Sequence, residues 1–158
     1  MANHIDEIEF TIFDTETTGL DPQGGDRIVE IAGLRFKGDE QIATFHSLVD
    51  PGRPISSAAF AVNGITPQML AGAPSSERVL PEFLDFIKDS CLCSYNAGFD
   101  LGFLNSELGI IGRRPLQEVI VIDILRMARR LLPGLQRYAL WFVAEKLGVQ
   151  SRQEHRAF

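Results

Sequence analysis

Several features that mark other classes of protein are scarce or missing in this 158-residue chain. It has 2 cysteines, and Cys91 and Cys93 lie too close in sequence for an ordinary disulfide. Without clustered partners they also make a poor zinc site, so we expect small core residues. No apolar run approaches the roughly 18 residues that span a bilayer, and residues 1–7 lack the basic and apolar regions of a signal peptide. These absences predict a cytoplasmic protein without a membrane partner.

The chain also lacks internal repeats and linkers, which together with its length favours a single domain over residues 1–158. A net charge of −6 argues against a nonspecific nucleic-acid coat, which would need a basic surface. It does not exclude an enzyme that acts on nucleic acid, because metal-binding carboxylates contribute negative charge. Basic residues are concentrated late in the chain, at Arg113, Arg114, Arg126, Arg129, Arg130, Arg137, Arg152 and Arg156.

Hydrophobic spacing predicts strands first and then alternating helices and strands. Three strands with short turns come first, at about 8–16, 27–37 and 41–49. Helices are expected at about 76–87, 97–108, 124–132 and 138–147, with strands at 91–96 and 119–123. Gly109 is expected just past the end of its helix. This order predicts an α/β fold with a mixed five-stranded sheet, an antiparallel meander followed by parallel strands and flanked by helices, which fits a ribonuclease H-like core.

The most informative segment is an apolar run that ends in Asp14 and Glu16. In a strand, side chains alternate between faces, so both carboxylates project from one face at the carboxyl end, where open α/β sheets bind ligands. Adjacent buried anions repel unless a cation or proton lies between them, and Mg²⁺ or Mn²⁺ prefers such oxygen ligands. Two acidic residues at this spacing, with no other signal beside them, usually mark only the polar end of a strand. The neighbouring hydroxyls and backbone N–H groups, however, suit a phosphate or a nucleotide end: Thr15, Thr17, Thr18 and Gly19.

Two further segments carry chemistry. Asn96 is expected to cap a helix that begins where a short buried strand ends. Asp100 lies in the first turn of that helix, where the helix dipole stabilises an anion. Alone, it would be only a favourable first-turn acid, but at the carboxyl end of a second strand it can converge with Asp14 and Glu16. His155 would normally be a solvated surface residue, but here it begins what looks like another helix.

Together these segments resemble the DnaQ-like (DEDDh) 3′→5′ exonucleases. The first motif of the family matches residues 14–19 throughout, and the second matches residues 96–100, with Tyr95 in place of a histidine. The third motif begins His-Arg-Ala, which matches residues 155–157. The fourth carboxylate of the family would fall just beyond Phe158. We therefore expect a chain truncated within its last catalytic motif, much less active than a version extended through the next helix.

The resemblance covers about residues 8–158. Residues 28–32 and 63–66 also match runs of the family, with Asn63 standing for a frequent histidine. Residues 122–149 are especially similar to the proofreading exonucleases of bacterial replicative polymerases, the epsilon-type exonucleases of DNA polymerase III. The resemblance implies that the protein acts on a single-stranded DNA 3′ end, with a polymerase catalytic subunit or a sliding clamp as partner.

The implied reaction is hydrolysis of phosphodiester bonds by two Mg²⁺ or Mn²⁺ ions, with release of nucleoside 5′-monophosphates. By resemblance, Asp14 bridges both ions, Glu16 completes one of them, Asp100 orients waters and His155 is the general base. The resemblance also implies substrate contacts near the site, with packing in the core an equal alternative for Leu20 and Phe99. These contacts are expected from Thr15, Thr17, Thr18, Gly19, Leu20, Val62, Asn63, Asn96 and Phe99.

Three other functions stay open from the sequence. An RNA-trimming, oligoribonuclease-type enzyme uses the same chemistry, and nothing in the chain distinguishes the sugar. A catalytically silent module attached to a polymerase or clamp is favoured if the fourth acid is truly absent. A ribonuclease H-like enzyme with another kind of substrate would keep Asp14 and Glu16, but it would not need the patterns around Asp100 and His155.

Overall fold

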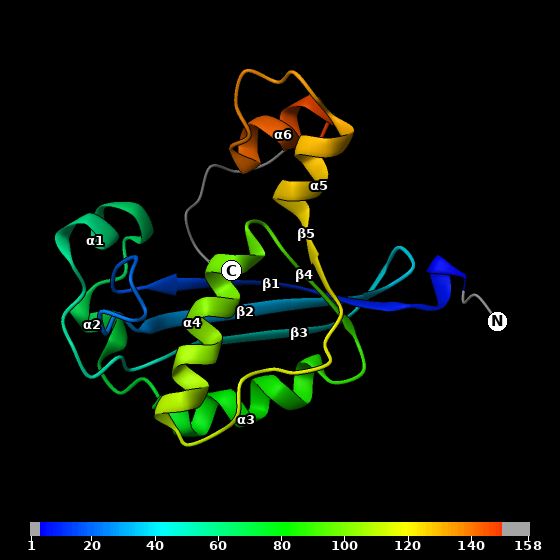
Figure 1. Cartoon of the computed structure of the whole chain (residues 1–158). Helices are drawn as coiled ribbons and strands as arrows, with labels where there is room; N and C mark the ends of the chain where they lie inside the picture. The colour runs from blue at the N-terminus through cyan, green and yellow to red at the C-terminus, as the bar shows by residue number, and fades with distance from the viewer. Residues whose placement is uncertain (1–3, 150–158) are drawn as a thin grey trace.

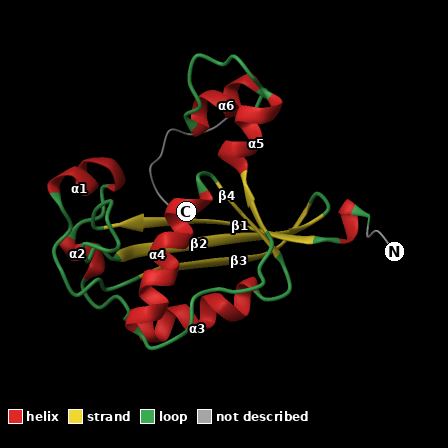
Figure 2. Cartoon of the chain, in the orientation of Figure 1, coloured by secondary structure: helices red, strands yellow, loops and turns green. Residues whose placement is uncertain are grey.

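The computed structural model describes residues 4–149, and its strands form one five-stranded mixed sheet (Figures 1 and 2). The strand order is β3-β2-β1-β4-β5. β1 pairs antiparallel with β2, as β2 does with β3, whereas β4 runs parallel to β1 and β5 parallel to β4. The expected meander followed by parallel strands is therefore confirmed. The strands are β1 (Glu9–Thr17), β2 (Ile28–Lys37), β3 (Glu40–Leu48), β4 (Cys91–Ser94) and β5 (Val121–Asp123).

Helices connect and cover these strands. Figure 1 shows α3 and α4 beside the sheet, α1 and α2 near the end of β1, and α5 and α6 projecting beyond β5. The helix expected to end before Gly109 is longer than predicted, and the αL glycine that follows it is Gly112, with a φ of +73°. The helices are η1 (Ile5–Glu7, a 3₁₀ turn), α1 (Ser57–Asn63), α2 (Pro67–Leu70), α3 (Ser76–Ile87), α4 (Ala97–Ile110), α5 (Ile124–Leu131) and α6 (Leu140–Lys146).

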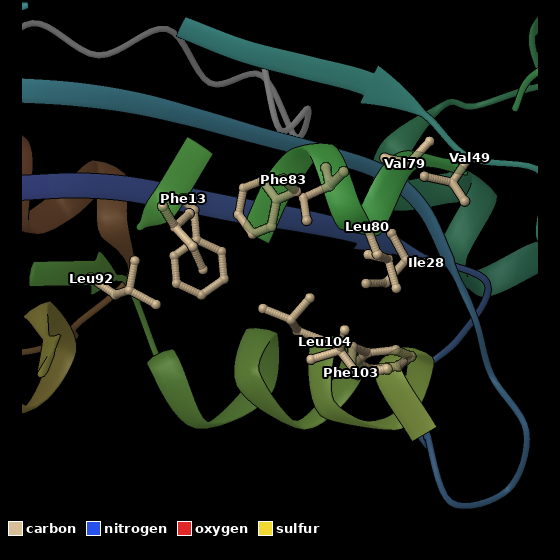
Figure 3. Packing of buried hydrophobic residues seen from close by; sticks show 12 residues of the cluster. Phe13, Ile28, Val49, Val79, Leu80, Phe83, Leu92, Phe103 and Leu104 are labelled. Carbon is tan, nitrogen blue, oxygen red and sulfur yellow. The ribbon is translucent and has the colours of Figure 1, made fainter. Parts of the chain in front are cut away.

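The core lies between the sheet and helices α3 and α4 (Figure 3). Phe13 on β1, Phe83 on α3 and Leu104 on α4 are at most 2% exposed. The rings of Phe13 and Phe83 lie 5.9 Å apart between centroids. Because burying each such side chain contributes about 1.5–3 kcal/mol, this cluster fixes the positions of β1 and α4. These are the two elements that carry the predicted carboxylates.

Side chains along β1 alternate as the sequence predicts. Thr11, Phe13 and Thr15 are buried on the core face, whereas Ile12 and Asp14 are exposed on the other face. Glu16 follows Asp14 on that face, because successive side chains of a strand point to opposite sides. The two carboxylates therefore share the face of β1 that is turned away from the core.

The two cysteines of β4 are buried free thiols, as expected. Burial raises the pKa of Cys93 to about 11, so its sulfur is held as the neutral thiol. None of the helices described between residues 4 and 149 has both the length and the apolar character needed to cross a bilayer.

Candidate active site

A pocket of about 1020 Å³ extends along β1 from Phe10 to Glu16, on the face that carries Asp14 and Glu16. Asp14 and Glu16 both line it, together with Thr15 between them. Most of the remaining wall is apolar and comes from strands β1, β2 and β4 and from helices α1, α5 and α6. Its members include Phe10, Ile12, Val62, Tyr95, Ile124 and Leu140.

The surroundings of Asp14 destabilise its charged, deprotonated form, although its side chain remains exposed to solvent within the pocket. Burial among the pocket walls and the negative charge of Asp100 raise the pKa of Asp14 to about 7, and Glu30 adds to the effect. A hydrogen bond with the backbone of Thr15 acts in the opposite direction. An anion in such a place is stabilised by a nearby positive charge, and a divalent cation supplies one.

Asp100 lies behind β1, on its core side, rather than in the pocket. It is 2% exposed and accepts hydrogen bonds from the backbone N and the Oγ1 of Thr15, at 3.0 and 2.7 Å, and from Ser94 Oγ. Burial raises the pKa of Asp100, while these bonds oppose the shift. Because Thr15 lies between the two pocket carboxylates, Asp100 fixes the strand end that positions both. The structure thus brings all three acids to one end of β1, on two sides of the strand.

The oxygen atoms of Asp14 and Glu16 fit a hard divalent cation. Within residues 4–149, no group of three or more acidic, histidine or cysteine side chains could hold a metal ion. Two carboxylates are nevertheless a usual protein share for Mg²⁺, which keeps several waters and binds substrate phosphates. His155 lies outside the described residues, so its expected role as the general base stays a prediction.

The threonine hydroxyls of the first motif are engaged within the protein. Thr15 Oγ1 bonds helix α4 as described above, Thr17 Oγ1 donates to the carbonyl of Gly19 at 2.6 Å, and Thr18 Oγ1 donates to Asp26 at 3.0 Å. The expectation that these hydroxyls are available to a phosphate was therefore wrong. The strand end and the turn use them because buried polar groups need partners. The backbone N–H groups of Thr15 and Thr18 are likewise engaged, by Asp100 and by the Arg27 carbonyl. A substrate contact from any of these residues stays a prediction.

Asp26 holds the turn that follows β1. Its carboxylate accepts hydrogen bonds from the Asp21 backbone N at 3.1 Å and from Thr18 Oγ1 at 3.0 Å. These bonds, with Arg53 nearby, hold the pKa of Asp26 below its ordinary value. A Cβ added at Gly19 would clash with the Asp26 carboxylate, so a larger residue there requires the Asp26 side chain to move. The turn built in this way presents Leu20, which is 83% exposed.

Gly19→Ala is expected to lower the free energy of unfolding by about 1–3 kcal/mol, as overpacking does. It is also expected to slow hydrolysis, because a displaced Asp26 releases the turn beside the pocket. Gly109→Ala is the matched control, since a Cβ there meets nothing within 4 Å. In helix α4 alanine is expected to be neutral or stabilising. Urea denaturation compares the two variants, and equal free energies of unfolding would contradict the steric account.

The other predicted contact residues differ in exposure. Val62 is 56% exposed and lines the pocket, whereas Phe99 is half-buried and packs on Phe103 with ring centroids 4.9 Å apart. Asn63 is 4% exposed, and its Nδ2 donates to the Thr17 carbonyl at 3.2 Å. Its Oδ1 accepts from the Ile65 backbone N at 3.0 Å. Asn63 therefore fastens α1 to the end of β1, and a substrate contact from it or from Phe99 stays a prediction.

Asn96 precedes helix α4 at the expected place, but its side chain makes no capping hydrogen bond. Its φ of +68° is in the left-handed region, which asparagine tolerates better than most residues. The expected side-chain cap was therefore wrong, because the chain turns sharply from β4 into α4. Asn96 is exposed at this corner, and its contact with substrate stays a prediction.

An ion pair that was not identified from the sequence, between Arg27 and Glu107, supports the turn that follows β1. Glu107 of α4 is 1% exposed, and its carboxylate accepts hydrogen bonds from Arg27 Nε and Nη2 at 2.7 and 2.9 Å. It also accepts from the Ile28 backbone N at 3.0 Å and from Ser76 Oγ at 2.6 Å. The Arg27 carbonyl in turn accepts from the Thr18 backbone N at 2.9 Å. A lone acid on the apolar side of a helix was the available signal for this network.

Known proteins match most of this chain. A family model described as exonuclease (RNase_T) matches residues 11–158. The chain is 41% identical to the DNA polymerase III PolC-type of Thermotoga maritima over 152 residues, 94% of this chain and 11% of that protein. It is 39% identical to the DNA polymerase III subunit epsilon of Treponema pallidum over 154 residues, 96% of this chain and 71% of that protein. The chain thus spans only about a tenth of the PolC-type proteins it matches.

Solved structures share the fold. Exonuclease X in complex with 5′ overhanging duplex DNA has a TM-score of 0.72 and 29% identity, covering 90% of this chain and 75% of that one. E. coli exonuclease I in complex with a dT13 oligonucleotide has a TM-score of 0.82, covering 96% of this chain and 38% of that one, and at 18% identity it shows the fold alone. The ribonuclease H-like fold predicted from the sequence is thereby confirmed. The matching family model and the DNA polymerase III relatives place this chain in the exonuclease family.

Proposed function

We propose that the chain is a metal-dependent 3′→5′ exonuclease of the DEDDh type that releases nucleoside 5′-monophosphates from single-stranded DNA. The arrangement at the end of β1 is the main support: Asp14 and Glu16 line one pocket, and Asp100 bonds the residue between them. DNA is favoured over RNA because the relatives are DNA polymerase III proteins and the structural neighbours were solved with DNA. The same relatives support proofreading beside a polymerase catalytic subunit.

In this proposal two Mg²⁺ or Mn²⁺ ions, when bound, would supply positive charge to the scissile phosphate and acidity to the attacking water. Asp14 and Glu16 would hold these ions, since both line the pocket on the face of β1 turned away from the core. Asp100 acts from the core side, where it keeps the strand end in place through Thr15. His155 is proposed to accept the proton of the attacking water, since an imidazole titrates near neutral pH.

The direction and the substrate are tested with oligonucleotides labelled at one end. A 3′-labelled DNA strand is expected to lose its label as a mononucleotide at once, while a 5′-labelled strand shortens stepwise. EDTA is expected to stop both reactions, and an RNA strand of the same sequence is expected to be cut more slowly. Release of the 5′ label first would contradict the proposed polarity, and faster cutting of RNA would favour the RNA-trimming alternative.

The raised pKa of Asp14 predicts how the metal-free protein responds to pH. The folded state has a pKa of about 7 at this carboxyl, against an ordinary value of 3.8, so it holds a proton that the unfolded chain has released. Stability without metal is therefore expected to fall as the pH rises from about 4 to about 7. Thermal unfolding in EDTA, at steps between about pH 5 and pH 8, measures the trend.

Asp14→Asn is the control for this trend, because asparagine has the same shape and does not titrate. The variant is expected to lose that part of the pH dependence and to melt higher than the wild type above neutral pH in EDTA. Mg²⁺ is expected to raise the melting temperature of the wild type more than that of the variant, because the cation favours the charged carboxylate. Parallel pH curves for the two proteins would contradict this assignment.

A further inference from the structure

Positive charge gathers on the part of the chain that projects beyond β5 (Figure 1). We call residues 124–146, which contain α5 and α6, the basic lobe. Its only acidic residue is Glu145, although the whole chain has a net charge of −6. The cations of the lobe are all exposed to solvent: Arg126, Arg129, Arg130, Arg137 and Lys146.

Three of these cations lie against aromatic rings: Arg129, Arg137 and Lys146. None of the ion pairs found among residues 4–149 involves a cation of the lobe. The Arg129 guanidinium lies 5.9 Å from the centroid of the Tyr138 ring, and that of Arg137 lies 5.7 Å from the Trp141 ring. Stacking orients a guanidinium without neutralising it, so its charge remains available to an anion.

The basic lobe forms one wall of the active-site pocket. Ile124 and Leu140, from α5 and α6, line the pocket that holds the two carboxylates. Tyr95, another lining residue, donates its hydroxyl to the Tyr138 carbonyl at 2.7 Å. The ring of Tyr138 is the one against which the Arg129 guanidinium lies, so Tyr95 links the pocket wall to a cation of the lobe.

We infer that the basic lobe binds backbone phosphates of the nucleic-acid strand upstream of the 3′ end held in the pocket. This inference rests on the proposed function. An acidic protein repels a polyanion at long range, and a local patch of cations beside the site attracts and guides it. The lobe continues directly from the pocket wall, so a strand whose end lies at Asp14 and Glu16 reaches it. That continuity favours a substrate strand over an acidic protein as the partner.

Salt dependence tests this inference, because each phosphate of a single strand that a cation neutralises adds about 0.7 to the slope of log affinity against log salt. Binding of a fluorescent oligothymidylate is measured by anisotropy in Ca²⁺ over a range of salt concentrations. Arg129→Gln combined with Arg130→Gln is expected to lower the slope by about 1.4. Arg113→Gln with Arg114→Gln removes the same charge from exposed positions after α4 and is expected to leave the slope unchanged.

A variant with lysine at both lobe positions separates charge from folding. It keeps the two charges and is expected to keep nearly the wild-type slope. Equal slopes for the two glutamine variants would overturn the inference and favour an acidic protein partner. If the lysine lobe variant loses as much of the slope as the glutamine lobe variant, the inference is overturned as well. Nucleotide release by the wild type in Mg²⁺ is measured separately, so failure of the proposed hydrolysis is distinguishable from failure of strand binding by the lobe.

Discussion

Asp14→Asn is expected to lower the rate of nucleotide release from a DNA 3′ end by about a thousandfold. A catalytic metal ion contributes several kcal/mol of charge stabilisation in the transition state. Since about 1.4 kcal/mol corresponds to a tenfold change in rate, losing about 4 kcal/mol accounts for this effect. Single-turnover release of a labelled 3′ nucleotide in saturating Mg²⁺ measures it.

Asp85→Asn is the matched control, because it removes the same charge from an exposed position on α3, on the core side of the sheet. The control is expected to retain the wild-type rate. Glu16→Gln is expected to behave like Asp14→Asn, since both carboxylates line the pocket. An Asp14→Asn protein that is folded and within about tenfold of the wild-type rate would remove the basis for the proposed site.

Glu107→Ala is expected to destabilise the protein by about 3–5 kcal/mol, because it leaves the Arg27 charge in a partly buried place without its partner. The Ile28 backbone N and Ser76 Oγ lose their acceptor at the same time. For a chain of this size, each kcal/mol lowers the melting temperature by about 2–4 °C. Differential scanning calorimetry measures the change.

Glu82→Ala is the control, since it removes an exposed acid of the same type from α3. Its effect is expected to lie within about 0.5 kcal/mol of zero, as is usual at the surface. The Glu107 variant is also expected to bind a DNA 3′ end less tightly, because Arg27 supports the Thr18 turn through its carbonyl. Similar melting temperatures for Glu107→Ala and Glu82→Ala would show that the ion pair contributes little to stability.

Local periodicity made much of the fold predictable. The alternation along β1 depends only on strand geometry, so the shared face of Asp14 and Glu16 could be predicted from their spacing. The relative directions of the strands, though not their order in the sheet, followed from the succession of elements, since short turns favour antiparallel neighbours and helical crossovers favour parallel ones. Asp100 was likewise located at the end of β4 by its place in the first turn of α4.

The partners of polar groups were not predictable in the same way. Asp100 bonds Thr15 across 85 positions of sequence, and Glu107 bonds Arg27 across 80. Such contacts depend on how α4 packs on the sheet, which no local pattern encodes. The same reason explains the threonine hydroxyls, which looked available in the sequence but are used by the turn and by α4. The burial of Asn63 likewise depends on the packing of α1 against the end of β1.

The central claim is that Asp14 and Glu16 bind divalent cations at the open face of β1. Anomalous scattering from crystals soaked in Mn²⁺ and a nucleoside 5′-monophosphate tests it most directly. We expect manganese within about 2–2.6 Å of oxygen atoms of both carboxylates, with the nucleotide phosphate on its other side. Well-ordered nucleotide in the pocket with no manganese at either carboxylate, or manganese bound only elsewhere, would contradict the account.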